Sequence, residues 1–221
     1  MERRFTLTRA SIGKKALVAI TGAVLFGFVV VHMLGNLQVF SGPEALNGYS
    51  HALHKVPELL WTARLILIVS VLVHISVSLS LVKQSAAARP VAYRVKRDLA
   101  TSYAARTMKW SGPLIAVFVI YHLAHFTWPG VAMGDYRHAA DDVYANVVNG
   151  FRVPWVVAIY VAAQVMLGFH LQHGAWSLFQ SLGLDHPRYH AVRRWVPRGF
   201  AAAVVIGNVA MPVAVLAGLV P

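Results

Sequence analysis

The chain has 221 residues, of which 57% are hydrophobic and only 13% are charged, about half the charged share of an ordinary soluble domain. It contains no cysteine, which excludes disulfides, thiolate metal sites, cysteine-bound iron–sulfur clusters and covalent haem attachment through a Cys-x-x-Cys-His motif. The formal net charge of +12 would suit nucleic acid, but its distribution argues against such a partner.

Five apolar segments follow one another along the chain, each long enough to cross ~30 Å of hydrocarbon. We place them near residues 16–40, 61–82, 110–128, 153–176 and 199–220. Pro, Gly and charged residues between them mark turns and boundaries, and Pro113 fits the first turn of the third helix. The sequence predicts an all-α integral membrane protein, a single membrane domain over residues 1–221 with five transmembrane helices.

Basic residues precede the first segment, as they do in a signal peptide. The apolar stretch that follows is too long for one, and no Ala-x-Ala-like cleavage site comes after it. We therefore expect a retained first helix.

Lys and Arg are distributed unevenly between the two sides that five crossings create. Sixteen of the twenty lie in segments 1–15, 83–109 and 177–198, which share one side. The positive-inside rule makes this side cytoplasmic, with the N-terminus inside and the C-terminus outside. The charge thus indicates membrane topology and anionic lipid rather than nucleic acid, and the basic face can also dock a soluble partner. No Asp, Glu or Lys remains within the predicted helices, which disfavours an ion-coupled transporter.

Histidine is the main polar residue left inside these segments, and it occurs on four of them. The residues are His32, His74, His122, His125, His170 and His173. An unpaired imidazole is costly in lipid, so each needs a partner. A lone histidine of this kind is usually a hydrogen-bonded packing residue, whereas histidines on four separate helices indicate shared metal ligands.

Distances along the helices divide four of these histidines into two levels. At ~1.5 Å per residue, His32 and His122 lie about 26 and 20 Å from the basic ends of their helices, and His74 and His170 about 14 and 10 Å from theirs. This pattern suits two bis-histidine haems stacked across the bilayer, with the first four helices forming a haem-binding bundle. Zinc is a poorer match, because no cysteine or carboxylate supports either pair.

Two of the four ligand positions stay open on physical grounds. His125 is three residues from His122, and His173 is three from His170, so each lies near the same helical face as its neighbour. Either member of each couple can reach an iron.

Short motifs in a fixed order extend over nearly the whole chain, and none is specific by itself. They are Ser11-Ile-Gly-Lys-Lys15, Val31-His-Met-Leu-Gly-Asn-Leu-Gln38, Asn47-Gly-Tyr-Ser-His51, Trp61-Thr-Ala-Arg64, Val73-His-Ile75, Tyr121-His-Leu123, Leu167-Gly-Phe-His-Leu171 and His173-Gly-Ala-Trp-Ser-Leu-Phe-Gln180. Taken together, their order and spacing resemble the single-chain, five-helix, di-haem cytochrome b anchor subunit of succinate dehydrogenase and fumarate reductase.

The resemblance implies which histidines bind iron. His32 and His122 would hold the outer haem b, and His74 and His170 the inner one. It also implies a bacterial inner membrane and two partners: a flavoprotein whose FAD oxidises succinate or reduces fumarate, and an iron–sulfur subunit on the basic inner face. This chain would be the quinone-reactive electron-transfer subunit of that respiratory complex II, mostly with menaquinone, and would carry out no dicarboxylate chemistry itself.

Polar residues near the helix ends are candidates for the remaining roles. Arg64 is an outer candidate for binding haem propionates, or else a snorkelling interfacial residue. Lys83 and Lys109 are inner candidates, or else markers of the inner face.

A quinone pocket needs an apolar slot, a hydrogen-bond donor and a proton source. Outside, the candidates gather around the first loop: Gln38, His51, His54 and Glu58, with Glu44 nearby. On the inner side, Ser11, Lys14 and Trp176 are alternatives. Each of these is otherwise an ordinary residue at a helix end.

Two other classes of protein stay open. One is a di-haem quinol cytochrome of a hydrogenase or formate dehydrogenase, whose haem ligands would be distributed differently over the helices. The other is a haem-free membrane protein, such as a transporter or a structural subunit.

Overall fold

The computed structural model describes residues 10–89, 91, 94, 101–128, 138–181, 183–184 and 186–220. Its elements are α1 (Ser11–Asn36), η1 (Leu37–Ser41), α2 (Pro43–His54), α3 (Pro57–Ala87), α4 (Tyr103–Phe126), α5 (Val143–Phe151), α6 (Pro154–Ser181), η2 (Pro187–Tyr189) and α7 (His190–Leu216). No strand occurs within the described ranges. The predicted all-α class is therefore confirmed.

Within the part of the chain that the structure describes, four helical segments are long and apolar enough to cross a membrane: Ser11–Ser41, Pro57–Ala87, Pro154–Ser181 and Pro187–Leu216. Large apolar side chains cover their outer surfaces; in α3, Leu65, Ile68 and Leu72 are each more than half exposed. A surface so widely apolar is stable against lipid rather than water. The chain is therefore a multi-pass membrane protein.

Helix α4, on which the third predicted segment falls, differs from the other long helices. It has 24 residues, but it is not one of the four segments that are both long and apolar enough to cross a membrane. Arg106 and Lys109 lie in its first turns, and His122 and His125 lie near its end. These polar residues shorten its apolar run, so a crossing by α4 stays a prediction.

Each long helix extends beyond its predicted apolar segment at one end at least, although α1, α4 and α7 stop two to four residues before the predicted ends. Helix α4 begins at Tyr103, well before residue 110, because the Ser102 hydroxyl caps it by accepting a hydrogen bond from the Ala105 N–H at 3.2 Å. The length of an apolar run reflects the thickness of the hydrocarbon layer. A helix can extend past this layer, because its end is set by where the backbone is capped. Pro113 consequently lies inside α4. The prediction that it belongs to the first turn of this helix is wrong. It leaves the Lys109 carbonyl without a helical partner.

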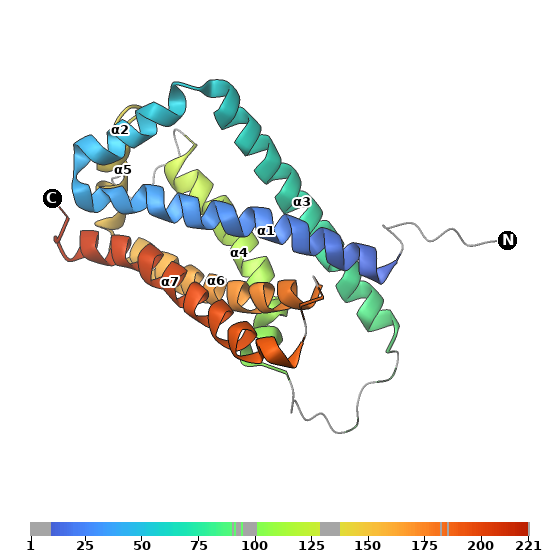
Figure 1. The fold of residues 1–221 in the computed structure, drawn as a ribbon. Helices are drawn as coiled ribbons and strands as arrows, with labels where there is room; N and C mark the ends of the chain where they lie inside the picture. The colour runs from blue at the N-terminus through green and yellow to red at the C-terminus, as the bar shows by residue number, and fades with distance from the viewer. Residues whose placement is uncertain are drawn as a thin grey trace.

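The five long helices, α1, α3, α4, α6 and α7, run in alternating directions, so that the start of α1 and the end of α7 lie at opposite ends of the molecule (Figure 1). Helix α6 packs along α4 and α7, and α1 packs along α3 and also contacts α6 and α7. Among the described residues, α3 has no comparable packing against α4 or α6. It is attached to the rest of the molecule through α1 and α2.

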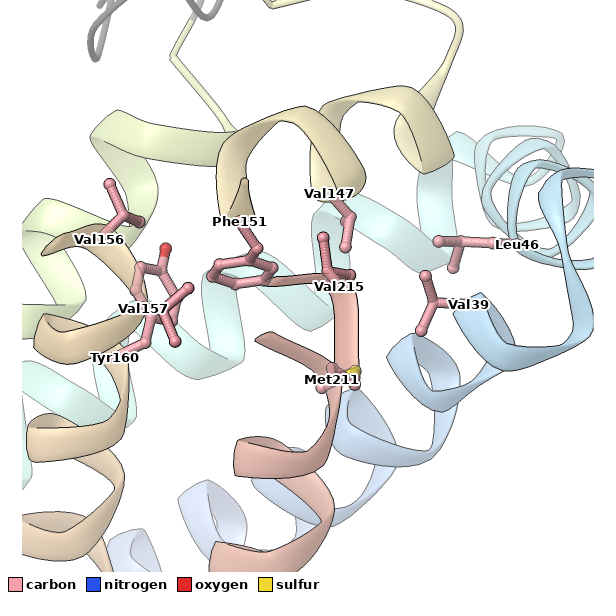
Figure 2. Packing of buried hydrophobic residues seen from close by; sticks show 9 residues of the cluster. All are labelled: Val39, Leu46, Val147, Phe151, Val156, Val157, Tyr160, Met211 and Val215. Carbon is pink, nitrogen blue, oxygen red and sulfur yellow. The ribbon is translucent and has the colours of Figure 1, made fainter. Parts of the chain in front are cut away.

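The largest buried apolar cluster lies at one end of the molecule, where the short helices α2 and α5 meet the long ones. Figure 2 shows side chains from η1, α2, α5, α6 and α7 converging there: Val39, Leu46, Val147, Phe151, Val156, Val157, Tyr160, Met211 and Val215. Asn47 joins α2 to α5, since its side chain donates to Asp142 at 3.0 Å and accepts from the Tyr144 N–H at 2.9 Å. We call this the outer end, and the end with the starts of α1, α4 and α7 the inner end.

Candidate functional site

His74 of α3 and His170 of α6 face each other in the inner half of the molecule. Their ring centroids are 6.3 Å apart and their planes are inclined at 58°. Among the described residues, α3 and α6 make at most slight backbone contact, so the two rings do not belong to an extended interface between these helices. Gly22 of α1 makes room for the His74 ring, since a Cβ at this position would lie 3.3 Å from His74 Cε1.

Each inner imidazole lies beside a hydroxyl from another helix. Thr21 Oγ1 lies 3.1 Å from His74 Nδ1, and Ser111 Oγ lies 3.4 Å from His170 Nδ1. The Thr21 hydroxyl already donates its proton to the Leu17 carbonyl at 2.7 Å, so its oxygen accepts from the His74 ring. The ring proton of His74 is then on Nδ1, which leaves the Nε2 lone pair for a metal.

His32 of α1 and His122 of α4 form a second pair nearer the outer end. Their ring centroids are 5.7 Å apart and their planes are at 90°. Here, too, the two helices make at most slight backbone contact among the described residues. His122 Nδ1 lies 3.2 Å from the Tyr160 hydroxyl, while the ring of Phe28 stacks on His32 at 5.2 Å.

The hydroxyl contacts of the inner pair also give the distance between the two histidine pairs along the helices. On α1, Thr21 at the inner pair precedes His32 by eleven residues, and on α4, Ser111 precedes His122 by eleven. Both spacings correspond to about 16 Å along a helix axis. Eleven residues are close to three full turns, so the hydroxyl and the histidine lie on one helix face. The four imidazoles therefore occupy two levels, as predicted from their distances to the basic helix ends.

His122, not His125, faces His32 across the helices. His125 is only 1% exposed, and its ring packs on Phe126 with centroids 3.9 Å apart. Its Nδ1 lies 2.9 Å from the Tyr160 hydroxyl, which the two histidines of α4 therefore share. This geometry gives His125 a place in the apolar core and leaves His122 at the interface with α1.

On α6, His170 and not His173 approaches His74. His173 is half-buried and its ring lies 6.2 Å from that of Trp176. The ring contact of His74 across to α6 is with His170. On both helices, therefore, the histidine that comes first in the sequence, His122 or His170, faces the histidine of the other helix.

Both pairs fit a metal held between two imidazoles. Metal–nitrogen bonds of about 2.0 Å, with an offset of about 1.1 Å from nitrogen to ring centre, place the two ring centres about 6 Å apart. The observed separations are 6.3 and 5.7 Å. Among the described residues, no group of three or more His, Cys, Asp or Glu could hold a metal ion. Two imidazoles suit the axial positions of a haem, whereas they do not complete a zinc site.

The residues predicted to bind haem propionates lie near helix ends. The Arg64 guanidinium is 5.0 Å from the centre of the Trp61 ring, and the Lys109 ammonium is 5.4 Å from that of Trp110. The side chain of Lys83 is exposed. Cation–aromatic contacts of this kind are typical of a membrane interface, so a propionate role stays a prediction.

The predicted quinone residues lie near the outer end. Gln38 is half-buried in η1, while His51 and His54 of α2 and Glu58 of α3 are exposed. His54 Nδ1 bonds to the Ser50 carbonyl of its own helix at 2.8 Å. Within the described part of the chain, no hydrogen bond joins any two of these four predicted residues.

The alternative quinone residues of the inner end are also spread apart. Lys14 donates to Ser80 Oγ at 2.7 Å and so ties α1 to α3. Ser11, at the first position of α1, and Trp176 are exposed. Lys14 thus has a structural contact of its own.

Sequence reasoning did not identify Thr21, Ser111 and Tyr160 as partners of the histidines. A signal for two of them is present, because each lies three turns before an outer histidine on its own helix. No comparable spacing marks Tyr160, whose contact depends on how α6 is rotated against α4.

Comparison with known proteins identifies no relative of this chain. No family model matches it, and no curated protein or solved structure is detectably similar. The resemblance to di-haem anchor subunits therefore rests on the sequence motifs alone.

Proposed function

We propose that this chain is a membrane cytochrome that holds two haems b and transfers electrons between a soluble iron–sulfur partner and a membrane quinone. His32 and His122 would hold the outer haem, and His74 and His170 the inner one. The observation that supports this most is the meeting of four imidazoles in two pairs, at two levels, between helices that make at most slight backbone contact. A haem held by two imidazoles would supply one-electron transfer rather than oxygen chemistry.

In this proposal α4 is the third of five membrane crossings. Its 24 residues measure about 36 Å, more than the hydrocarbon layer requires. The histidines that lower its apolar character are turned toward other side chains: His122 faces His32, and His125 lies beside Tyr160. Five crossings put sixteen of the twenty Lys and Arg on one side, which makes the inner end and the N-terminus cytoplasmic.

The chain's own side chains orient the ligands. Thr21 and Ser111 hold Nδ1 of the two inner imidazoles, and Tyr160 holds Nδ1 of His122. Such hydrogen bonds fix the tautomer and the ring orientation of a metal-bound histidine, and they keep Nε2 for the metal.

The assignment to a succinate dehydrogenase or fumarate reductase is the finer part of the proposal, and the motif resemblance supports it. A flavoprotein with FAD would carry out the dicarboxylate chemistry, and an iron–sulfur subunit would dock on the basic inner end. Menaquinone would bind at the outer end, near Gln38, His51, His54 and Glu58. Imidazole and carboxylate side chains are the groups that most often donate or accept protons in enzyme sites.

Haem content tests the cytochrome proposal. The complex would be extracted from membranes with its companions in mild detergent, and its haem measured by reduced-minus-oxidised spectra and haem extraction. We expect a sharp reduced alpha band and two haems b per chain. A colourless, iron-free complex would overturn the proposal.

The companions test the finer assignment in the same preparation. A flavoprotein and an iron–sulfur protein with succinate:quinone activity support it. A hydrogenase or formate dehydrogenase subunit in their place would leave the cytochrome intact and remove the succinate assignment.

The two levels are arranged for electron transfer across the membrane. Moving one charge through the full membrane potential is worth about 2.3 kcal/mol per 100 mV. If electrons pass from the inner to the outer end, the potential drives the oxidation of succinate by menaquinone. An uncoupler should then inhibit succinate:quinone activity in intact cells, and insensitivity to the uncoupler contradicts this direction.

A further inference from the structure

A hollow of about 300 Å³ lies between α6 and α7, on a part of the surface that neither histidine pair uses. Its apolar wall includes Val165 and Phe169 of α6 and Ala202 and Ile206 of α7. Val165 is 41% exposed and Ile206 68% exposed, so the hollow opens sideways toward lipid rather than into the molecule. This volume gives room for part of one hydrocarbon chain.

Two polar side chains line the same hollow, one from each helix. Arg198 of α7 lies at the start of the apolar run of its helix, and Gln172 of α6 lies across from it. Arg198 also lies over the exposed ring of Trp195, with its guanidinium carbon 5.4 Å from the ring centre. A tryptophan beside an arginine is typical of the level at which lipid headgroups begin.

Among the described residues, the charged side chains near the hollow are basic. Tyr103 of α4 packs on Phe169 with ring centroids 5.2 Å apart, and Arg106 lies over the Tyr103 ring at 5.8 Å. Helices α4, α6 and α7 contain no Asp or Glu. Arg198 therefore lines an apolar slot, and Arg106 lies near it beyond Tyr103, while the three helices supply no anion for either cation. The ligand that fits is an anion with a hydrocarbon tail.

We propose that this hollow binds an anionic phospholipid from the inner leaflet. One acyl chain lies in the slot between α6 and α7, and the headgroup phosphate accepts hydrogen bonds from Arg198 and Gln172. A neutral quinone would not use the cations, and a free phosphate ion would not use the apolar walls. Basic pockets between transmembrane helices on the cytoplasmic side bind anionic headgroups in this way. The proposal requires no haem.

Native mass spectrometry of the detergent-extracted complex tests this site. The complex is delipidated stepwise and then titrated with phosphatidylglycerol or phosphatidylcholine. We expect one phosphatidylglycerol to be retained longest and rebound in preference to phosphatidylcholine. Arg198→Gln should weaken rebinding about fivefold, the effect of one basic residue near a lipid surface, and Arg198→Lys should restore most of it. Ala202→Phe, which fills the slot, should abolish rebinding.

Two neighbouring residues supply matched controls. Arg194 and Ala203 are exposed on α7 but do not line the hollow, so Arg194→Gln and Ala203→Phe should rebind lipid as the wild type does. Equal binding of both lipids, or equal loss in Arg194→Gln and Arg198→Gln, overturns the proposal. So does a co-purified quinone in place of the lipid, or competition by inorganic phosphate alone. A thermal unfolding curve for each variant distinguishes a lost site from a misfolded chain.

Discussion

The inner and outer histidine levels are supported in different ways. At the inner level each imidazole has a hydroxyl of its own: Thr21 lies beside His74, and Ser111 lies beside His170. The two hydroxyls come from different helices, α1 and α4. Each ring is therefore oriented independently of the other.

At the outer level one hydroxyl serves two imidazoles. Tyr160 bonds to both His122 and His125, and its ring belongs to the buried cluster at the outer end (Figure 2). His32 stacks on Phe28, and its ring nitrogens have no hydrogen-bond partner among the described residues. One pair member is thus held through the protein core, and the other by ring stacking.

This difference indicates what each level depends on. A change at the inner level should stay local, because no side chain is shared between its two ligands. A change at Tyr160 or His125 should affect both the outer ligand and the stability of the outer end. The predictions below test this contrast, from the largest expected effect to the smallest.

Removal of a ligand has the largest expected effect. His74→Ala and His170→Ala should each abolish the same inner haem and keep the outer one, so that haem per chain falls by half. The reason is that both imidazoles of a pair would bind the same iron, so removing either one takes away one of the two protein–iron bonds that hold that haem. Haem extraction and reduced spectra of each variant measure this. The control is His173→Ala, which should keep both haems. If His74→Ala and His170→Ala remove different haems, the proposed pairing is wrong.

The second prediction concerns the buried histidine of the outer level. His125→Leu should retain both haems but destabilise the protein by about 1–3 kcal/mol, because the change removes a buried hydrogen bond of Tyr160. The matched change His173→Leu, at a half-buried position, should cost less. Thermal unfolding and haem content measure the two effects separately. Loss of the outer haem in His125→Leu but not in His122→Leu would exchange the ligand assignment on α4.

The third prediction compares the hydroxyl supports. Thr21→Val should weaken only the inner haem and Tyr160→Phe only the outer haem, each by about 10–100-fold in affinity, the usual effect of losing a partner of a metal-bound histidine. Competition for released haem by a haem scavenger, followed at the two alpha-band components, measures this. A variant that weakens both haems equally shows that the two levels are not independently supported.

The sequence predicts the two levels well and their supports poorly, for a physical reason. The depth of a histidine follows from the constant rise per residue of a helix, so residue numbers are enough. The contacts of Thr21 and Tyr160 depend on how helices rotate and pack against one another, and no single helix encodes that. The sequence also misplaces helix ends, as at the start of α4 before Pro113. The length of an apolar run reflects the thickness of the lipid layer, and a helix can extend beyond that layer.

The smallest expected effect is at the outer end, where α2 and α5 are tied together. The carboxylate of Asp142 accepts hydrogen bonds from the Ala145 N–H at 2.9 Å and from the Asn47 amide at 3.0 Å. The Ala145 bond, and then that of Asn47, hold the pKa of Asp142 below its usual 3.8. Because the folded pKa lies below the unfolded one, this stabilisation is complete above about pH 4 and is lost as the pH falls through the folded value.

Asp142→Ala should therefore destabilise the protein by about 1 kcal/mol at neutral pH, the usual cost of losing an N-cap, and the difference should shrink in acid. Thermal unfolding of the extracted complex between about pH 3 and pH 7 measures it. Asp142→Asn keeps the acceptor oxygen without the charge, so it should retain most of the stability and lose the pH dependence. A difference between wild type and Asp142→Ala that stays constant over this range means that the uncharged cap, and not the carboxylate, holds α5 against α2. Neither inner imidazole should respond to any of these changes, because the Asp142 contacts lie wholly at the outer end.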